Sequence, residues 1–229
     1  MKIQYFTEKL SIPGQKLKPI EQLLEIELPN NMAKYNIKNS NSIESNYSLG
    51  LLPQRNNQNF WYLDTSSRSN LSVFSLSSEN RRIVNKTQDF SYSFQPLSDF
   101  QYTLTVQKDI HNWINQLGWD FPISSVKKIF TDHIFNFVYV WKNQQNQVVA
   151  YSICYFSDQI SHIAYVFYNP NLSHNNLPIR LVLQTIIDSH DQKLKFCYLG
   201  RFALETGYYK RNMPGFEYFK EGNWIKYEK

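Results

Sequence analysis

Apolar and polar residues follow their clearest pattern in the C-terminal half of the chain. Residues 135–142, 148–156 and 161–168 are rich in aromatic and β-branched side chains and are separated by polar segments, which is typical of strands joined by hairpins. Residues 178–190 predict an amphipathic helix that opens with proline, a residue favoured in the first helical turn. A fourth strand is expected at 195–199. This order predicts a right-handed crossover between the last two strands.

The middle of the chain, residues 107–133, is expected to be helical. Apolar residues recur at spacings of three and four along residues 110–117, so they form one face of a helix. Gly118 is expected to end that helix, because glycine readily adopts the left-handed backbone found at helix ends. A second helix is expected at about residues 124–133.

The pattern is weaker toward the N-terminus. Residues 47–106 are expected to be rich in strands, with candidates at 60–63 and 71–76, although the alternation slips within 71–76. Residues 77–82 predict a helix or a turn, with Ser77 or Ser78 as its cap. A short helix is expected at 20–26, after the turn signal Pro13-Gly14, and the polar residues 36–46 are expected to form a loop.

The C-terminal order of elements resembles the acetyl-CoA-binding core of GNAT proteins. In that fold the two strands joined by the helix splay apart, and the gap exposes backbone donors to an acyl carbonyl. The resemblance implies an α+β protein: a GNAT-like mixed sheet with a crossover helix in the C-terminal half, and a smaller strand-rich N-terminal region. We therefore divide the chain into a region at 1–106 and a GNAT-like domain at 107–229.

Composition sets broad limits. The 229 residues, 42% of them hydrophobic, suffice for one sizeable core or two small ones. The formal net charge of +5 is compatible with an RNA or another phosphate-bearing partner, and equally with none. Cys154 and Cys197 each lie in an apolar stretch, so buried free thiols are expected. No signal-peptide core or membrane-length apolar segment is visible, so we expect a cytoplasmic protein without membrane contact.

Three C-terminal motifs carry a more particular resemblance. They are AYVFYNP at 164–170, FCYLGRF at 196–202 and GYYKRNMPGFEYF at 207–219. Their order resembles the C-terminal domain of the aminoacyl-tRNA–protein transferases, the arginyl and leucyl enzymes of the N-degron pathway. In that family a Tyr-Asp-Pro-like strand end, a Tyr-Leu-Gly strand end and a Tyr-Lys pair follow one another. Here Tyr168-Asn169-Pro170, Tyr198-Leu199-Gly200 and Tyr209-Lys210 take those places.

The N-terminal half agrees through shorter motifs. Ile12-Pro13-Gly14 resembles the family's early turn, and FSLSSENRRIVNK at 74–86 is similar to its basic segment. The chain departs from the family in two places. It has no cysteine before Cys154, so we expect neither a metal nor an iron–sulfur cluster, and no other cofactor. The loop before the crossover helix is HNNLPIR and lacks the glycine-rich backbone that cradles a phosphate.

The resemblance implies that the α-amine of an acceptor protein attacks the ester of an aminoacyl-tRNA. Such an amine has a pKa near ~7.7–8.0, so positioning and an oxyanion-stabilising donor are expected to matter more than a strong base. The candidate centre is the backbone at 166–168, with Tyr168 and Asn169 facing the reacting atoms. The alternative is that Tyr168 is a core or rim aromatic and Asn169 a turn residue before Pro170.

Two groups of residues are candidates for contacts with the substrates. Cations beside aromatic rings can bind phosphates and stack on bases, and the alternative is a solvated basic face. The candidate tRNA contacts are Arg81, Arg82, Lys86, Tyr209, Lys210 and Arg211. The candidate acceptor contacts are Tyr198, Gly200 and Glu205, with a surface carboxylate as the alternative for Glu205.

Three functions stay open at this point. The first is transfer of an amino acid from aminoacyl-tRNA to a protein N-terminus, as in N-degron tagging. The second is a GNAT acyltransferase that uses acetyl-CoA or another thioester. The third is a non-catalytic homologue that binds RNA or a peptide terminus. No histidine or cysteine has metal-ligand spacing, and no Gly-x-Ser-x-Gly elbow is present, so a zinc enzyme and a serine hydrolase are not expected.

Overall fold

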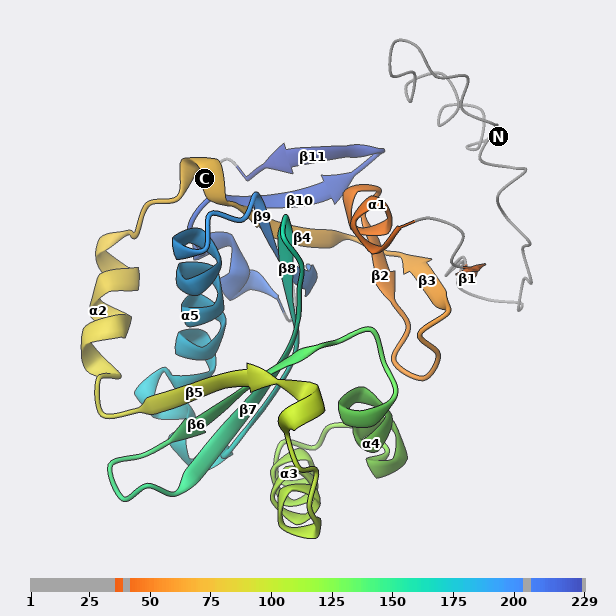
Figure 1. The fold of residues 1–229 in the computed structure, drawn as a ribbon. Coiled ribbons are helices and arrows are strands. Elements are labelled where there is room, and N and C mark those ends of the chain that lie inside the picture. Colours follow the sequence, from red (N-terminus) through yellow and green to blue (C-terminus); the bar gives the residue numbers. More distant parts are fainter. Residues whose placement is uncertain (1–35, 39–41, 204–206, 228–229) are drawn as a thin grey trace.

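A computed structural model describes residues 36–38, 42–203 and 207–227 (Figure 1). The predicted helix at 20–26, the Ile12-Pro13-Gly14 motif and Glu205 lie outside these residues. The strands are β1 (Asn36–Lys38), β2 (Leu51–Pro53), β3 (Phe60–Leu63), β4 (Ser66–Asn70), β5 (Ser91–Pro96), β6 (Phe137–Lys142), β7 (Val148–Phe156), β8 (Ile160–Tyr168), β9 (Phe196–Arg201), β10 (Phe216–Lys220) and β11 (Asn223–Lys226). The α-helices are α1 (Ile43–Ser48), α2 (Ser78–Lys86), α3 (Leu104–Gln116), α4 (Ile123–Thr131) and α5 (Leu177–Asp191). Four short 3-10 turns are η2 (Leu71–Val73), η3 (Leu97–Asp99), η4 (Pro170–Asn175) and η5 (Tyr208–Asn212).

An eight-stranded mixed sheet organises the described chain, so the protein is α+β with a GNAT-like arrangement. Its strand order is β11-β10-β4-β9-β8-β7-β6-β5. Strands β8 and β9 pair in parallel and are joined by α5, whereas the other neighbours in this sheet pair antiparallel. A smaller antiparallel sheet has the order β1-β3-β2.

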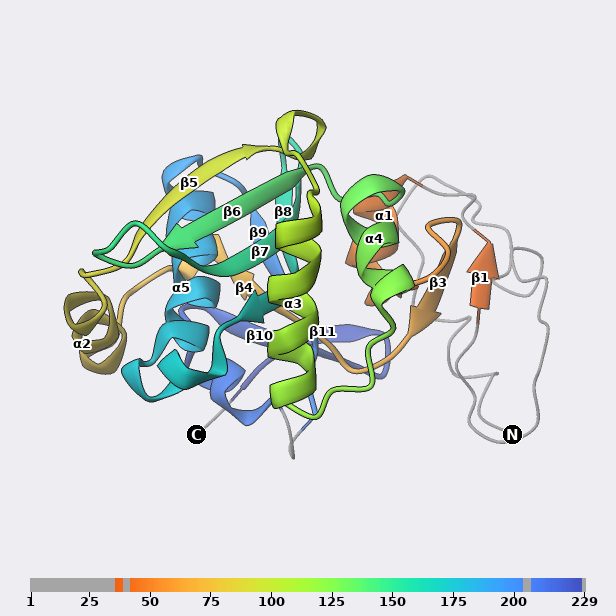
Figure 2. The same ribbon diagram turned by 90° about the horizontal axis from the view of Figure 1, so that it is seen from below.

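Helices cover both faces of the large sheet, so its central strands are buried on both sides. Along β7 the side chains of Tyr151 and Ile153 join a core that includes α3 and α4, while Ala150 and Cys154 join a core formed with α5. This alternation follows from the two-residue period of a strand. Figure 2 shows α3 in front of the strands and α5 behind them.

The C-terminal predictions are confirmed, with ends that move by one or two residues. The strand at 148–156 has the predicted bounds, and the crossover helix runs from Leu177 to Asp191. Gly118 has a φ of 63°, the left-handed backbone expected just after a helix. Ser77 caps α2 by accepting from the Asn80 amide. Both cysteines are free and buried.

Two predictions in the N-terminal half are wrong. Residues 71–76 do not form a strand: Leu71–Val73 is a 3-10 turn, and the strand lies just before it at Ser66–Asn70. The expected loop at 36–46 contains β1 and the start of α1, which Ser42 caps by accepting from the Ser45 amide. Both errors have one cause: apolar pattern was the criterion, so the polar segments that form β4, β1 and α1 were missed and the apolar segment 71–76 was taken for a strand.

Strand β4 is polar in sequence yet buried between β9 and β10. The side chain of Arg68 pairs with Glu217 on β10, with its Nε 2.7 Å from the carboxylate. Its guanidinium lies between the rings of Phe196 and Trp224, at 3.7 and 4.1 Å from their centroids. Strand β4 and strand β5 precede residue 106 and lie in the same sheet as β6–β11.

Removing the partner of Arg68 is expected to destabilise the fold. Glu217→Ala leaves a guanidinium that is only 8% exposed without its carboxylate, which typically costs ~3–5 kcal/mol. Urea unfolding measures this loss. Glu79→Ala breaks the exposed pair with Arg82 and is the control, with a much smaller expected change. Equal effects of the two substitutions would contradict the structural role of Arg68.

Candidate functional site

The parallel strands β8 and β9 separate after three paired positions. Their pairs are Ile160 with Phe196, Ser161 with Cys197, and His162 with Tyr198. Strand β8 then continues to Tyr168 and β9 to Arg201 without facing each other. The gap lies beside the start of the crossover connection, as the GNAT resemblance implies.

Each strand carries one extra residue directly beyond the last shared pair. In β8, Ile163 faces Cys154 and Tyr165 faces Ile153, so Ala164 is a bulge. In β9, Tyr198 faces Arg68 and Gly200 faces Ser67, so Leu199 is a bulge. A bulge bends its strand and increases the local twist. Two bulges on facing edges therefore turn β8 and β9 away from each other.

The carbonyls that β9 would have offered to β8 are bound by a lysine. Lys210 of η5 places its Nζ 2.6 Å from the oxygen of Leu199 and 2.7 Å from that of Arg201. Burial lowers the pKa of Lys210 to about 8, so the amine still carries its charge for most of the time at neutral pH. Lys210 thus holds the open edge of β9 in place of a paired strand.

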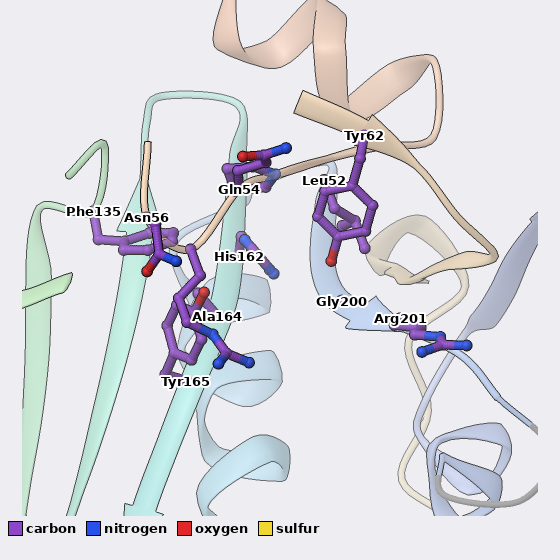
Figure 3. A pocket seen from close by; sticks show the side chains of 12 residues that line it. Leu52, Gln54, Asn56, Tyr62, Phe135, His162, Ala164, Tyr165, Gly200 and Arg201 are labelled. Atoms are coloured by element: carbon purple, nitrogen blue, oxygen red, sulfur yellow. The ribbon is translucent and has the colours of Figure 1, made fainter. Parts of the chain in front are cut away.

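A cavity of about 430 Å³, here called the first cavity, opens on one side of the gap (Figure 3). Its walls come from β8, the end of β9, the β2–β3 hairpin and the segment before β6. The lining residues are Leu52, Pro53, Gln54, Arg55, Asn56, Tyr62, Phe135, His162, Ala164, Tyr165, Gly200 and Arg201. Arg55 and Arg201 are exposed, and Arg201 pairs with Asp64 at 3.1 Å. Its wall therefore mixes polar and apolar surface and carries two arginines.

A second cavity of about 230 Å³ adjoins the first. Its lining residues are Trp119, Phe121, Ile163, Ala164, Tyr165, Val166, Phe167, Val182, Leu199, Tyr209 and Lys210. Ala164 and Tyr165 line both cavities, so the bulged edge of β8 separates them. Trp119 and Tyr209 are 39% and 36% exposed, which leaves ring surface free at this cavity.

His162 is buried at the mouth of the gap. Its Nδ1 lies 2.6 Å from the hydroxyl of Tyr47, a side chain of α1 that packs among the rings of Trp61 and Tyr198. Its Nε2 has no hydrogen-bond partner among the described residues. Burial, and then the charges of Lys210 and His133, lower the pKa of His162 to about 3. The ring is therefore neutral at physiological pH.

Gly200 keeps the space in front of this histidine open. Its φ of 74° is a conformation that other residues adopt only with strain. A Cβ at this position would lie 3.6 Å from Nε2 of His162 and 4.0 Å from Nζ of Lys210. Ser67 donates to the Gly200 carbonyl at 2.8 Å and fixes the turn.

The predicted backbone centre at 166–168 meets the second cavity in part, since Val166 and Phe167 line it. Tyr168 pairs with Ala150 on β7, is half-buried against Trp119 and lines neither cavity. The Asn169 side chain accepts from the Asn171 amide at 3.1 Å, as a turn residue does. The backbone nearest the cavities is two to four residues earlier, at Ala164–Val166. A catalytic role for Tyr168 and Asn169 stays a prediction.

The predicted substrate contacts fall in different places. Gly200 lines the first cavity, and Tyr209 and Lys210 line the second. Tyr198 is only 1% exposed and packs against Tyr47. Arg211 lies 3.0 Å from the centroid of the Tyr208 ring and donates to the Tyr227 hydroxyl.

The basic residues of α2 lie away from both cavities. Arg81, Arg82 and Lys86 are exposed on a helix that packs against α5, and none of them lines either cavity. Arg82 pairs with Glu79, and Arg81 donates to the Leu76 carbonyl. If these residues contact RNA, they do so on a surface that is separate from the gap.

Sequence reasoning missed His162, Tyr47 and the β2–β3 hairpin. His162 was one of five scattered histidines, and no local motif marks its neighbours. One signal was present: a histidine inside an otherwise apolar strand is a buried polar group that requires a partner. The partner, Tyr47, is 115 residues away in sequence.

Two further features are absent from the part of the chain that the structure describes. No group of three or more His, Cys, Asp or Glu side chains is arranged there to hold a metal ion. No helix in the same ranges has the length and apolar character of a membrane span.

No family model matches the chain, and no curated protein matches it. Solved structures resemble its fold: the C-terminal domain of a protein from Agrobacterium fabrum described as a lysylphosphatidylglycerol synthetase has 10% identity and a TM-score of 0.47, over 60% of this chain and 46% of that one. FemX has 8% identity and a TM-score of 0.46, over 74% of this chain and 62% of FemX. A GCN5-related glucosamine N-acetyltransferase region of a fungal β-N-acetylglucosaminidase has 10% identity and a TM-score of 0.46, over 84% of this chain and 24% of that one.

This chain therefore spans less than two thirds of each of these structures. One of the three is a GCN5-related N-acetyltransferase region, and none of the three is named as an N-degron enzyme. At such identities and TM-scores the likeness concerns the fold and carries no statement about substrate.

Replacing Lys210 is expected to destabilise the gap. Lys210→Met removes the donor to two strand carbonyls, and a buried carbonyl left unpaired costs ~1–3 kcal/mol. Water can replace the exposed bond to the Arg201 carbonyl, so we expect a loss of roughly 1–3 kcal/mol in the free energy of unfolding, measured in urea. Lys220→Met, on the exposed end of β10, is the control. A loss no larger than that of the control would show that the β9 edge does not need the lysine.

The neutral state of His162 predicts a pH-dependent stability. Its native pKa of about 3 lies below the unfolded value of ~6.5, so the unfolded state alone gains a proton as the pH falls. The free energy of unfolding should fall below pH ~6.5 by up to ~1.4 kcal/mol per pH unit. Burial also lowers the pKa of His133, which adds to the slope.

Unfolding in urea at pH 7.5 and 5.5 tests this expectation. His162→Gln should flatten the dependence, whereas His111→Gln, exposed on α3, should leave it as in the wild type. An unchanged slope in His162→Gln would contradict a buried neutral imidazole.

Proposed function

We propose that this protein transfers an amino acid from an aminoacyl-tRNA to the N-terminal α-amine of an acceptor protein. The observation that carries the proposal is the separation of β8 and β9 after His162 and Tyr198. It leaves a strand edge at Ala164, shared by two cavities, where an ester carbonyl can lie between two substrates. The motif resemblance adds the aminoacyl donor to this general acyl-transfer geometry.

The reaction needs little beyond alignment and stabilised charge. The amine nitrogen attacks the ester carbon, a C–N bond forms, and the carbonyl oxygen becomes an oxyanion. Collapse of this tetrahedral intermediate breaks the bond between the carbonyl carbon and the ribose oxygen. The ribose oxygen leaves as a hydroxyl with the proton that the amine releases. Holding two reactants in the correct geometry and stabilising the oxyanion supply most of the rate enhancement in such a step.

The two cavities suit the two substrates differently. The second has the exposed rings of Trp119 and Tyr209, which offer stacking surface to the terminal base of a tRNA. The first is larger, and Gly200 and Arg201 lie at its edge, so we place the acceptor there. This division agrees with the motif-based roles of Tyr209 and Lys210 for tRNA and of Gly200 for the acceptor.

Use of acetyl-CoA or another thioester is the second candidate. The same strand separation favours it, because the GNAT fold uses this gap for an acyl thioester. The start of α5 counts against it: Asn176 has a φ of 60°, its side chain makes no capping hydrogen bond, and the preceding loop has no glycine to bring backbone close to a phosphate.

A transfer assay decides between these candidates. The full chain is incubated with each of the twenty charged tRNAs, labelled in the amino acid, and with peptides whose N-termini are acidic, basic or apolar. Labelled peptide with a new N-terminal residue is expected, with binding that weakens steeply as salt rises. An acetylated peptide from acetyl-CoA, without any aminoacyl product, would favour the thioester. Product from neither donor would contradict both transferase functions and favour a binding protein.

The exposed ring of Tyr209 at the second cavity provides a test of the proposed tRNA site. Tyr209→Ala removes stacking surface worth ~1–3 kcal/mol per base, so KM for the charged tRNA should rise ~10-fold or more with a smaller change in kcat. Tyr92→Ala is the control, since Tyr92 is similarly exposed and lines neither cavity. A KM that stays at the wild-type value would place the tRNA end elsewhere.

A further inference from the structure

We propose that His162 is a catalytic residue whose Nε2–H donates a hydrogen bond to the ester carbonyl oxygen as that oxygen becomes an oxyanion. This inference rests on the proposed transfer reaction and assigns its electrophilic group. The motif resemblance did not assign a role to this histidine.

The position of the ring makes this role possible. His162 is the last β8 residue paired with β9, so its side chain lies where the strands begin to separate. It is 4% exposed, lines the first cavity, and has an Nε2 without a partner among the described residues. Figure 3 shows the ring projecting from β8 into the space that Tyr62 and Gly200 border. The residue lines the cavity, and its unpartnered Nε2 is a buried donor for which a ligand in the cavity can supply the acceptor.

Tyr47 determines which ring nitrogen carries the hydrogen. Among the described residues the Tyr47 hydroxyl has one hydrogen-bond partner, Nδ1 of His162 at 2.6 Å. If the imidazole donated to the phenol oxygen, the buried hydroxyl hydrogen would have no acceptor. A phenol is also a far stronger acid than a neutral imidazole N–H, so the favoured arrangement is O–H donating to Nδ1. The neutral ring then carries its hydrogen on Nε2.

Burial is the main cause that keeps the ring in that neutral form. The groups that face it are Tyr47 of α1, His133 after α4 and Lys210 of η5. Burial and the latter two hold the pKa of His162 near 3, so protonation does not compete at physiological pH. A neutral imidazole with hydrogen on Nε2 cannot accept a proton at that atom, but it can polarise a carbonyl, as neutral histidines do in other enzymes.

Each step of the transfer leaves His162 unchanged. As the amine forms its C–N bond, the carbonyl electrons move to oxygen, and Nε2–H stabilises the charge. When the ribose oxygen leaves with the amine's proton, the carbonyl is restored and the hydrogen bond weakens. The donor is already oriented by Tyr47, so no reorganisation accompanies the charge.

Two substitutions at this position separate a donor from a base. His162→Gln places an amide N–H near the position of Nε2 but cannot accept a proton. His162→Ala removes both abilities. For a donor, kcat in the transfer assay should fall ~100–1000-fold in His162→Ala and stay within ~10-fold of wild type in His162→Gln. His111→Gln, on the exposed face of α3, should match wild type.

The alternatives give different results. If both His162 variants are folded and equally inactive, His162 acts as a base and the donor role is wrong. If His162→Ala transfers as fast as wild type, the residue takes no part, while the proposed function stands. If wild type makes no product from any charged tRNA, the proposed function fails and this inference fails with it.

The tautomer can be measured without any substrate. In ¹⁵N-histidine-labelled protein, Nδ1 of His162 should show the shift of an unprotonated nitrogen and Nε2 that of an N–H, from pH 8 down to about pH 5. Tyr47→Phe should change the Nδ1 shift and leave the other histidines unaffected. A hydrogen on Nδ1 in the wild type would overturn the proposal.

Discussion

Backbone groups released by the parting of two parallel strands must find other partners, and the site depends on how this chain satisfies them. On β9 the carbonyls of Leu199 and Arg201 are bound by Lys210, and that of Gly200 by Ser67. Strand β8 keeps its pairing with β7 but bulges at Ala164. The gap is therefore a stable part of the fold, with one edge filled by a lysine and the other open to two cavities.

The N-terminal half of the chain contributes several parts of the site around His162. Helix α1 brings Tyr47 against His162, and the hairpin of β2 and β3 closes the first cavity. Strand β4 lies against β9 and supplies Ser67. Residues more than a hundred positions apart thus meet around one histidine, and an isolated C-terminal half would lack both its tautomer-setting partner and one wall of the cavity.

The parts of the fold that follow local pattern could be predicted from the sequence. The strands at β6 to β9 and the helix between β8 and β9 show regular apolar periodicity, and the GNAT resemblance of their order implies the splayed pair. Strand β4 could not be predicted in the same way, because Ser66–Asn70 is polar and is a strand through its pairing with β9 and β10, where Glu217 partners Arg68. Residues 71–76 have the composition of a strand, yet they begin with a 3-10 turn.

The sequence motifs indicated part of the chain that lines the cavities, but not the two bulges or the role of His162. The motifs name Gly200, Tyr209 and Lys210, and these three residues line the two cavities, because strand ends mark where backbone becomes free. They could not place the bulges, which depend on the register of β8 against β7 and of β9 against β4. The role of His162 could not be predicted from its neighbours in the sequence either, because it depends on the Tyr47 hydroxyl of α1.

The central claim is that an acyl carbonyl enters the gap between β8 and β9. The most direct measurement is a crystal structure with a stable amide analogue of an aminoacyl-adenosine. The predicted result has the carbonyl oxygen at the Ala164 edge, within hydrogen-bond distance of Nε2 of His162, and the adenine against Tyr209 or Trp119. A structure in which the analogue binds away from the gap, or in which β8 and β9 are hydrogen-bonded along their full length, would contradict the claim.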